Sequence, residues 1–196
     1  MSNHETLKDF IKGKTVVVVG NSERMLERDY SKFIDSFDVV VRLNHGRPLL
    51  TTGTKTTIWA SIYKVENPRA LREHYKKFKS PIIVRFGSRA KKPITADLES
   101  RTWFVKSDRQ LLEMFRNRKA ESRGEPRAYP SIGSRVVDWL YGELGVEAID
   151  LVGFDFFDTG TWYRPGEENC YKCHTPSIDK KFIVNHPAVT LHEYSQ

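Results

Sequence analysis

The 196-residue sequence has little cysteine and no long apolar run. Its two cysteines are too few for a closed structural zinc site, which needs four ligands. No zinc-finger spacing or RNA-binding signature is present, so we expect no nucleic acid partner. No apolar stretch reaches the length that spans a bilayer, and the N-terminus lacks the apolar core of a secretory signal. These absences predict a cytoplasmic globular protein.

Acidic residues are fewer than basic ones, 25 against 32, which gives a formal net charge of +7. A positive protein attracts anionic partners such as a sugar nucleotide, a phosphorylated glycolipid, an acidic polysaccharide or an anionic membrane surface. Most of this charge is mixed with acidic residues, as on a solvated helix face. The chain length fits a single domain, residues 1–196.

Two segments near the N-terminus predict strands of one parallel sheet. Val16 to Val19 form an apolar, β-branched run that suits a strand buried on both faces. Gly20-Asn21-Ser22 then permits a sharp turn. The second predicted strand includes Ile34, Phe37, Val39, Val40 and Val41, and it ends at Asn44. Parallel strands end at one sheet edge, where α/β proteins bind ligands, although such turns also occur without any ligand.

A third segment predicts a helix followed by a buried strand. Ser131, Gly133 and Ser134 lie where the helix should begin, and exposed N–H groups there would suit a phosphate or carboxylate. Its predicted core face consists of Val136, Val137, Leu140, Tyr141 and Leu144, and Gly145 is a helix stop. Residues 148–152 predict the strand that follows.

The remaining apolar patterns complete an alternation of strands and helices. Strands are predicted at residues 58–62, 82–86, 103–105 and 188–194, and helices at residues 5–12, 67–79 and 108–119. This alternation predicts an α/β fold with a mainly parallel sheet flanked by helices.

Two of these segments resemble the sialylmotifs of glycosyltransferase family 29, the sialyltransferases. Gly20-Asn21-Ser22, Tyr30, Ile34-Asp35, Phe37-Asp38 and Arg42-Leu43-Asn44 are similar to the long sialylmotif. Residues 130–133 (PSIG) through 150–154 (DLVGF) are similar to the short sialylmotif, and the two occur in the right order. The resemblance implies a single Rossmann-like domain, the GT-A-like variant of the sialyltransferases.

The resemblance also implies an inverting, metal-independent transferase that uses no cofactor. Its donor substrate would be the CMP ester of a nonulosonic acid sugar, sialic acid or Kdo. Its acceptor would be a hydroxyl of a glycan or glycolipid, as in polysaccharide biosynthesis. By position in the motifs, the residues that would bind the donor are Gly20, Asn21, Ser22, Asn44, Ser131, Ile132 and Gly133. The helix that begins near Gly133 would stabilise negative charge on the departing phosphate.

The acceptor hydroxyl must lose its proton, and neutral imidazole is well matched to this task near neutral pH. In family 29 a histidine lies beyond the short sialylmotif and is followed by an acidic residue. His174, with Asp179 after it, is the best match here. His186 and His192 compete for the role, but both lie in or beside the predicted final strand.

The chain departs from the family pattern in two places. Family members have a His-Tyr pair before the base, whereas here Tyr163 is preceded by Trp162. Stabilisation of the leaving group would then rest on Tyr163, Arg164 or a helix end. The disulfide that joins the two motifs in the animal enzymes would fall near Val16 and Val146, which cannot form one. This loss agrees with a reducing compartment.

Two local patterns suggest other chemistry. Cys170, Cys173 and His174 match the spacing of covalent haem attachment, which conflicts with the missing export signal. A redox dithiol or a chance pair of cysteines fits better. Asp155 and Asp158 resemble a two-aspartate metal motif, but their spacing is wrong and the intervening Phe156-Phe157 predicts core. We therefore expect no metal requirement.

Two functions of different classes are compatible with these patterns. The first is a CMP-sugar-dependent, sialyltransferase-like enzyme with His174 and Tyr163 as its catalytic residues. The second is a nucleotide- or glycan-binding module of the same fold without turnover, which the missing histidine before Tyr163 favours.

Overall fold

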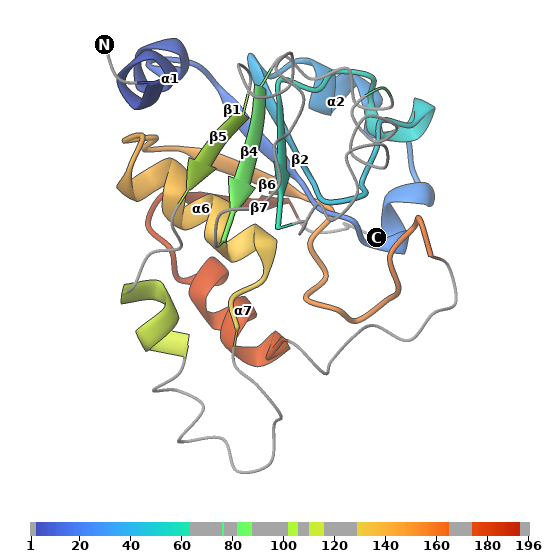
Figure 1. Ribbon diagram of the computed structural model, residues 1–196. Helices are drawn as coiled ribbons and strands as arrows, with labels where there is room; N and C mark the ends of the chain where they lie inside the picture. Colours follow the sequence, from blue (N-terminus) through green and yellow to red (C-terminus); the bar gives the residue numbers. More distant parts are fainter. Residues whose placement is uncertain are drawn as a thin grey trace.

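The computed structural model describes residues 3–62, 76, 82–87, 102–105, 110–115, 129–164 and 174–192. Within these residues, seven strands form one sheet in the order β5-β4-β3-β2-β1-β6-β7 (Figure 1). The strands are β1 (Val16–Val19), β2 (Val39–Leu43), β3 (Ile58–Ser61), β4 (Ile82–Phe86), β5 (Thr102–Val105), β6 (Ile149–Val152) and β7 (Val189–His192). Each neighbouring pair is parallel, which confirms the predicted α/β fold.

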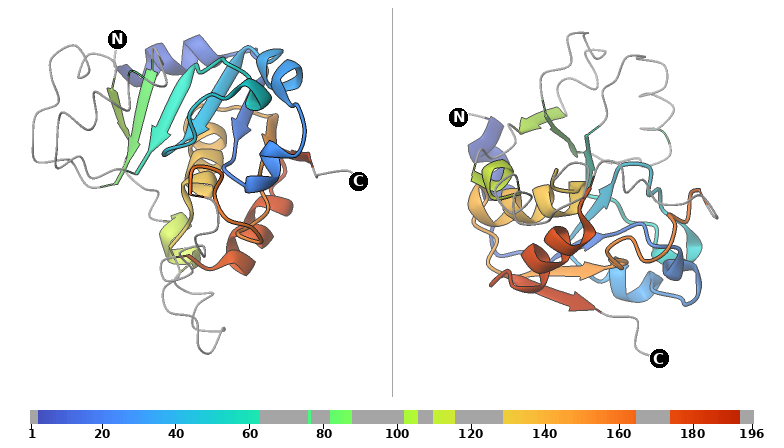
Figure 2. Two further views of the ribbon diagram at one scale, coloured as in Figure 1. Left: turned by 90° about the vertical axis from the view of Figure 1, so that its right-hand side faces the viewer. Right: turned by 90° about the horizontal axis from the view of Figure 1, so that it is seen from below.

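Helices cover both faces of this sheet. They are α1 (Asn3–Ile11), α2 (Ser31–Asp35), α6 (Ile132–Gly142) and α7 (Pro176–Val184), together with the short 3-10 helices η1 (Glu23–Leu26) and η2 (Leu50–Thr52). Residues of α1, α6 and α7 share one core cluster with the sheet, whereas α2 and η1 belong to a separate cluster with β1, β2 and β6. Helix α1 lies toward the amino ends of the strands, away from their carboxyl ends (Figure 2). Among the described residues, no helix has the length and apolar character needed to cross a membrane.

The four valines of β1 are buried because β1 lies inside the sheet, between β2 and β6. Val16 and Val18 belong to the core cluster shared with α6, and Val17 and Val19 belong to the cluster shared with α2. Successive side chains of a strand point to opposite faces, so a strand covered on both faces needs apolar residues at every position. The continuous valine run is therefore explained by helices on both sides.

Helix α6 begins where the sequence predicts. The hydroxyl of Ser131, the N-cap residue, accepts a hydrogen bond from the backbone N–H of Ser134 (3.2 Å), which satisfies a donor that has no partner within the helix. The helix end is followed by Gly145, whose φ of +70° favours glycine. Tyr141 was expected in the core, but it is 44% exposed because its ring lies at the helix end, against His186. Trp139, which was not predicted for the core face, is 2% exposed and belongs to the core cluster.

The second predicted strand begins too early, and several predictions lie outside the described residues. Ile34 belongs to helix α2 rather than to the second strand, which begins only at Val39. The helix predicted at 67–79 lies outside the described residues except at position 76. Residues 110–115 are helical, as predicted, while the rest of the 108–119 prediction and residues 193–194 of the final strand are not described.

The turns after β1 and β6 touch through their backbones. The N–H of Gly20 donates to the carbonyl of Val152 (2.7 Å), and the N–H of Ser22 donates to the carbonyl of Gly153 (3.2 Å). A Cβ atom at Gly20 would lie 2.1 Å from the carbonyl oxygen of Gly153, a distance at which the backbone must move. Glycine at position 20 therefore permits the pairing of β1 and β6 to continue past the strands.

We expect Gly20→Ala to lower the free energy of unfolding by about 2 kcal/mol or more, because the added methyl meets backbone rather than a flexible side chain. Gly142→Ala is the matched control. A Cβ there meets nothing within 4 Å, and alanine in a helix is more stable than glycine by about 0.5–1 kcal/mol. Urea unfolding of both variants measures the difference. Equal stability of the two variants would contradict the steric argument.

Candidate functional site

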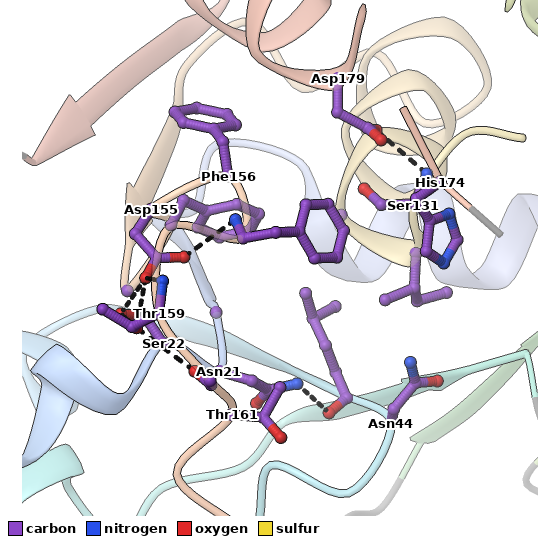
Figure 3. Close-up of a pocket in the computed structure, with 18 of the residues that line it drawn as sticks. Asn21, Ser22, Asn44, Ser131, Asp155, Phe156, Thr159, Thr161, His174 and Asp179 are labelled. Atoms are coloured by element: carbon purple, nitrogen blue, oxygen red, sulfur yellow. Dashed lines mark hydrogen bonds between the residues drawn. The ribbon is translucent and has the colours of Figure 1, made fainter. Parts of the chain in front are cut away.

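A pocket of about 460 Å³ opens at the carboxyl ends of β1, β2 and β6 (Figure 3). The strand order reverses at β1, since β2 to β5 follow it on one side and β6 and β7 lie on the other. Such switch points are where open α/β sheets bind ligands. The lining includes every residue predicted for the site: Gly20, Asn21, Ser22, Asn44, Ser131, Ile132, Gly133, Tyr163 and His174.

Asn21 joins the three turns that surround the pocket. Its backbone carbonyl accepts from the N–H of Trp162 (3.1 Å), and its side-chain Nδ2 donates to the carbonyl of Leu43 at the end of β2 (3.1 Å). Its Oδ1 atom is buried, has no hydrogen-bond partner in the described part of the chain and lies against Gly46, where a Cβ would come within 1.9 Å of it. Asn21 thus fixes the turn after β2 and the 161–164 turn relative to β1.

Asn44 is held by its backbone and by one side-chain oxygen. Its φ of 47° is left-handed, a conformation that asparagine tolerates better than most residues. Its carbonyl accepts from the indole N–H of Trp59 (2.7 Å), and its Oδ1 accepts from the N–H of Ile62 (3.3 Å). Among the described residues its Nδ2 has no partner, so this side chain can still donate to a ligand.

Ser22 is committed to the protein rather than exposed to a ligand. It is 4% exposed, and its hydroxyl donates to Asp155 Oδ2 (2.8 Å) and accepts from the N–H of Arg24 (3.2 Å). The same carboxylate accepts from the N–H groups of Phe157 (3.1 Å) and Thr159 (2.9 Å). The geometry therefore favours Ser22 as a brace for the loop that follows β6, rather than as a side-chain contact to the donor.

The loop braced by Asp155 contains two strained residues. Phe156 and Phe157 have φ values of 55° and 71°, in the left-handed region that bulky residues rarely adopt. Both are partly buried and line the pocket, and Phe156 packs against the main core cluster, in agreement with the predicted core position. The ring of Phe157 stacks on the imidazole of His174, with centroids 5.5 Å apart and planes 18° from parallel.

The N-terminus of α6 presents two backbone donors to the pocket. The N–H of Ser131 donates to Asp179 Oδ1 (3.0 Å), and the N–H of Ser134 is capped by Ser131. This leaves the N–H groups of Ile132 and Gly133, which have no partner within the helix. A Cβ at Gly133 would lie 2.5 Å from the ring of Phe154, so glycine is needed for this close approach. Two amides at a helix N-terminus form an anion site.

Asp179, in α7, is a buried carboxyl group that contacts the start of α6. It is 1% exposed and accepts from the N–H of Ser131 and from the hydroxyl of Ser134, while its Oδ2 has no hydrogen-bond partner among the described residues. Burial raises the pKa of Asp179, although hydrogen bonds from Ser134 and Ser131 and the proximity of His174 oppose the shift. Asp179 thus ties α7 to the start of α6 beside the pocket.

His174 has a defined tautomer. Its Nδ1 lies 3.1 Å from the backbone carbonyl of Tyr129, an atom that can only accept, so Nδ1 carries the hydrogen. Nε2 is then the unprotonated nitrogen of the neutral ring, and no described residue bonds to it. The two competing histidines do not line the pocket: His192 bonds to Asp150 (2.6 Å), and His186 packs against Tyr141 and Phe182.

Tyr163 contacts a histidine, His45, for which the sequence predicted no role. The ring of His45, in the turn after β2, lies 5.3 Å from the ring of Tyr163, and both line the pocket. The sequence also gave no site role to Asp155 or Phe157. A usable signal existed only for His45, which directly follows Asn44, because the other contacts join residues far apart in the chain.

No metal ligand set is formed by the part of the chain that the structure describes: it holds no group of three or more His, Cys, Asp and Glu side chains placed for an ion. Asp155, one of the two aspartates weighed as metal ligands, is occupied by the hydrogen bonds described above. The cysteine pair Cys170 and Cys173 lies outside the described residues.

Comparisons with known proteins relate the chain to one family and one fold. The family described as Glycosyltransferase family 29 (sialyltransferase) matches residues 4–131. The match includes Asn21 and Asn44 and ends before Tyr163 and His174. No curated protein matches the chain.

Two solved structures are similar in fold. A mammalian sialyltransferase in complex with Gal-beta-1-3GalNAc-ortho-nitrophenol has a TM-score of 0.52 at 16% identity, over 94% of this chain and 71% of that chain. A variant of the sialyltransferase CST-II in complex with CMP has a TM-score of 0.56 at 14% identity, over 91% of this chain and 80% of that chain. These sialyltransferases share the α/β fold described here.

Asp179→Asn tests the buried carboxyl through the pH dependence of stability. Because the folded pKa lies above the ordinary value of 3.8, the folded protein holds a proton in this interval that the unfolded chain has released. The resulting stability is fully present below the unfolded pKa and is lost as pH rises through the folded pKa. We expect the wild type to gain stability relative to Asp179→Asn as pH falls from about 7 to about 4.

Urea unfolding of both proteins across this range measures the effect. The difference between the two proteins isolates Asp179 from the other carboxyl groups, which both share. A difference that stays constant, or one that moves in favour of the variant at low pH, would show that burial does not disfavour the charged form.

Proposed function

Since the chain belongs to glycosyltransferase family 29, the sialyltransferases, we propose that it transfers a nonulosonic acid sugar from its CMP ester to a hydroxyl of a glycan or glycolipid. The donor sugar is sialic acid or Kdo, since both carry a carboxylate beside the anomeric carbon. The CMP complex of CST-II, a protein of similar fold, supports a cytidine nucleotide as the carrier. The net charge of +7 suits an anionic acceptor, such as a surface polysaccharide or a glycolipid in an anionic membrane.

One observation carries this proposal: His174 shares a pocket with Asn21, Asn44 and the start of α6, although the family match ends before it. A transferase needs a base and a donor site within reach of one another. The turns after β1 and β2 and the first turn of α6 supply the donor side of the pocket, and the segment before α7 supplies the base.

In the proposed reaction, Nε2 of His174 accepts the proton of the acceptor hydroxyl as its oxygen attacks the anomeric carbon. The hydrogen bond from Nδ1 to Tyr129 keeps Nε2 available as acceptor, and Phe157 holds the ring from its face. The departing CMP phosphate gains negative charge, for which the N–H groups of Ile132 and Gly133 and the Nδ2 of Asn44 are suitable donors. Attack from the face opposite the phosphate inverts the anomeric centre.

We expect His174→Gln to lower kcat by about 100-fold or more, because the acceptor hydroxyl loses its base. Affinity for CMP should change little, since the variant keeps the donor side of the pocket. Transfer is measured by mass spectrometry of a glycan acceptor with CMP-sialic acid and CMP-Kdo, with a UDP-sugar as the negative control. His186→Gln is the matched variant, because His186 lies outside the pocket lining.

An unchanged rate in His174→Gln would remove His174 as the base. Selective CMP binding by a wild type that transfers neither sugar would instead favour the binding module of the same fold. That alternative has no specific structural support here.

Transfer should also proceed at an undiminished rate in excess EDTA, because the proposed charge stabilisation comes from amides and side chains rather than from an ion. The measurement is the same transfer assay before and after dialysis against the chelator. Activity that is lost on chelation and restored by magnesium or manganese would contradict this prediction.

A further inference from the structure

We infer that His45 is a second histidine of the reaction and carries positive charge to the phosphate of the donor nucleotide. The inference rests on the proposed function, because it assigns a role within the same donor site. It starts from the position of His45 in the pocket, beside Asn44 and against Tyr163.

The turn that holds His45 is rigid on both sides. Asn44 before it is left-handed, with its backbone carbonyl bonded to Trp59. Gly46 after it donates its N–H to the carbonyl of Leu43 (2.9 Å), which closes the turn at the end of β2. Gly46 also lies against Asn21, where no side chain would fit. His45 is therefore fixed by backbone contacts at the carboxyl edge of the sheet.

The imidazole of His45 also contacts a second wall of the pocket. Its ring lies 5.3 Å from that of Tyr163, at an interplanar angle of 56°, and Tyr163 in turn packs against Trp162 at 5.5 Å. Trp162 is 8% exposed, and its N–H is bonded to Asn21. His45 and Tyr163 thus join the turn after β2 to the 161–164 turn, on the side of the pocket that carries Asn44.

The charged groups that line the pocket divide into two sets. The carboxylates are Asp155 and Asp179, and each accepts hydrogen bonds from donors of the protein. The side chains that can carry positive charge are His45, Arg164 and His174. His174 must be neutral to act as a base, and Arg164 is exposed at the edge of the 161–164 turn. Histidine gains a proton near neutral pH, so His45 is the partly buried group that can meet an anion as a cation.

The reaction gives this charge a defined task. The acceptor oxygen forms a bond to the anomeric carbon, the bond from that carbon to the phosphate oxygen breaks, and its electron pair stays on that oxygen. The acceptor's proton passes to His174. The released CMP phosphate has gained one negative charge, and a protonated His45 stabilises it by donating a hydrogen bond to a phosphate oxygen.

The test compares two ligands that differ only in phosphate: CMP and cytidine. Calorimetric titration of the wild type should show CMP bound about 10-fold or more tightly than cytidine, since a charge-assisted hydrogen bond contributes this much affinity. His45→Gln should lower the affinity for CMP by about 10-fold, the contribution of one charge-assisted hydrogen bond, and leave cytidine affinity unchanged. His45→Lys keeps a cation and should restore part of the preference. Arg47→Gln removes an exposed cation two residues away, outside the pocket lining, and should have no effect.

The outcomes separate the role of His45 from the identity of the donor. A wild type that prefers CMP, together with a His45→Gln variant of equal preference, would overturn the role of His45 and leave the donor site in place. A wild type that binds CMP and cytidine equally would overturn it as well. A wild type that binds neither ligand would contradict the proposed donor itself. Thermal melting of the variants checks that each is folded.

Discussion

The close backbone contact between Gly20 and Gly153 is the constraint on which the pocket depends. At this point the chain order of the sheet reverses, and the turns after β1 and β6 leave the sheet together. The missing Cβ at Gly20 lets the two backbones pair beyond their strands. The loops after these turns stay in contact, because the hydroxyl of Ser22 donates to Asp155 (2.8 Å), and residues of both loops line the pocket.

The polar groups around this contact are arranged so that the pocket presents donors to a ligand. Its two carboxylates, Asp155 and Asp179, are turned toward hydroxyl and backbone N–H groups of the protein. The donors that line the cavity include the side-chain amide of Asn44 and the first turn of α6. A site built in this way favours an anion, and preorganised donors are effective when charge develops during a reaction. His174 lies in the segment before α7, and its ring is oriented by Tyr129 and Phe157.

The elements that the sequence predicted well are those whose pattern is local. The valine run of β1 and the capped start of α6 follow from neighbouring residues, and both agree with the structure. Ile34 was misassigned because α2 has only five residues, too few to display a helical period. Tyr141 follows the spacing of a core face, but it lies in the last turn of α6, next to the surface. A periodic pattern does not show where a helix extends beyond the elements that pack against it.

The residues of the candidate site were predicted from motifs, but the contacts that join these residues to one another were not. The motifs named Asn21, Asn44 and Ser131, the family pattern beyond them named His174, and the structure brings all four to one pocket. The contact of His45 with Tyr163 and the bonds of Asp155 to Ser22 join residues more than a hundred positions apart. Such pairs depend on the order of strands in the sheet, which no local pattern carries. For the same reason the motifs could name Ser22 as a donor-site residue but not the bond from its hydroxyl to Asp155.

The most direct test of the donor site is a crystal structure of the protein with CMP. We expect the phosphate to lie at the N-terminus of α6, with an oxygen about 3 Å from the N–H of Ile132 or Gly133 and from the Nδ2 of Asn44. His174 should lie on the side of the pocket left open for the acceptor. CMP bound elsewhere on the protein, or with its phosphate directed away from α6, would contradict the assignment of this pocket as the donor site.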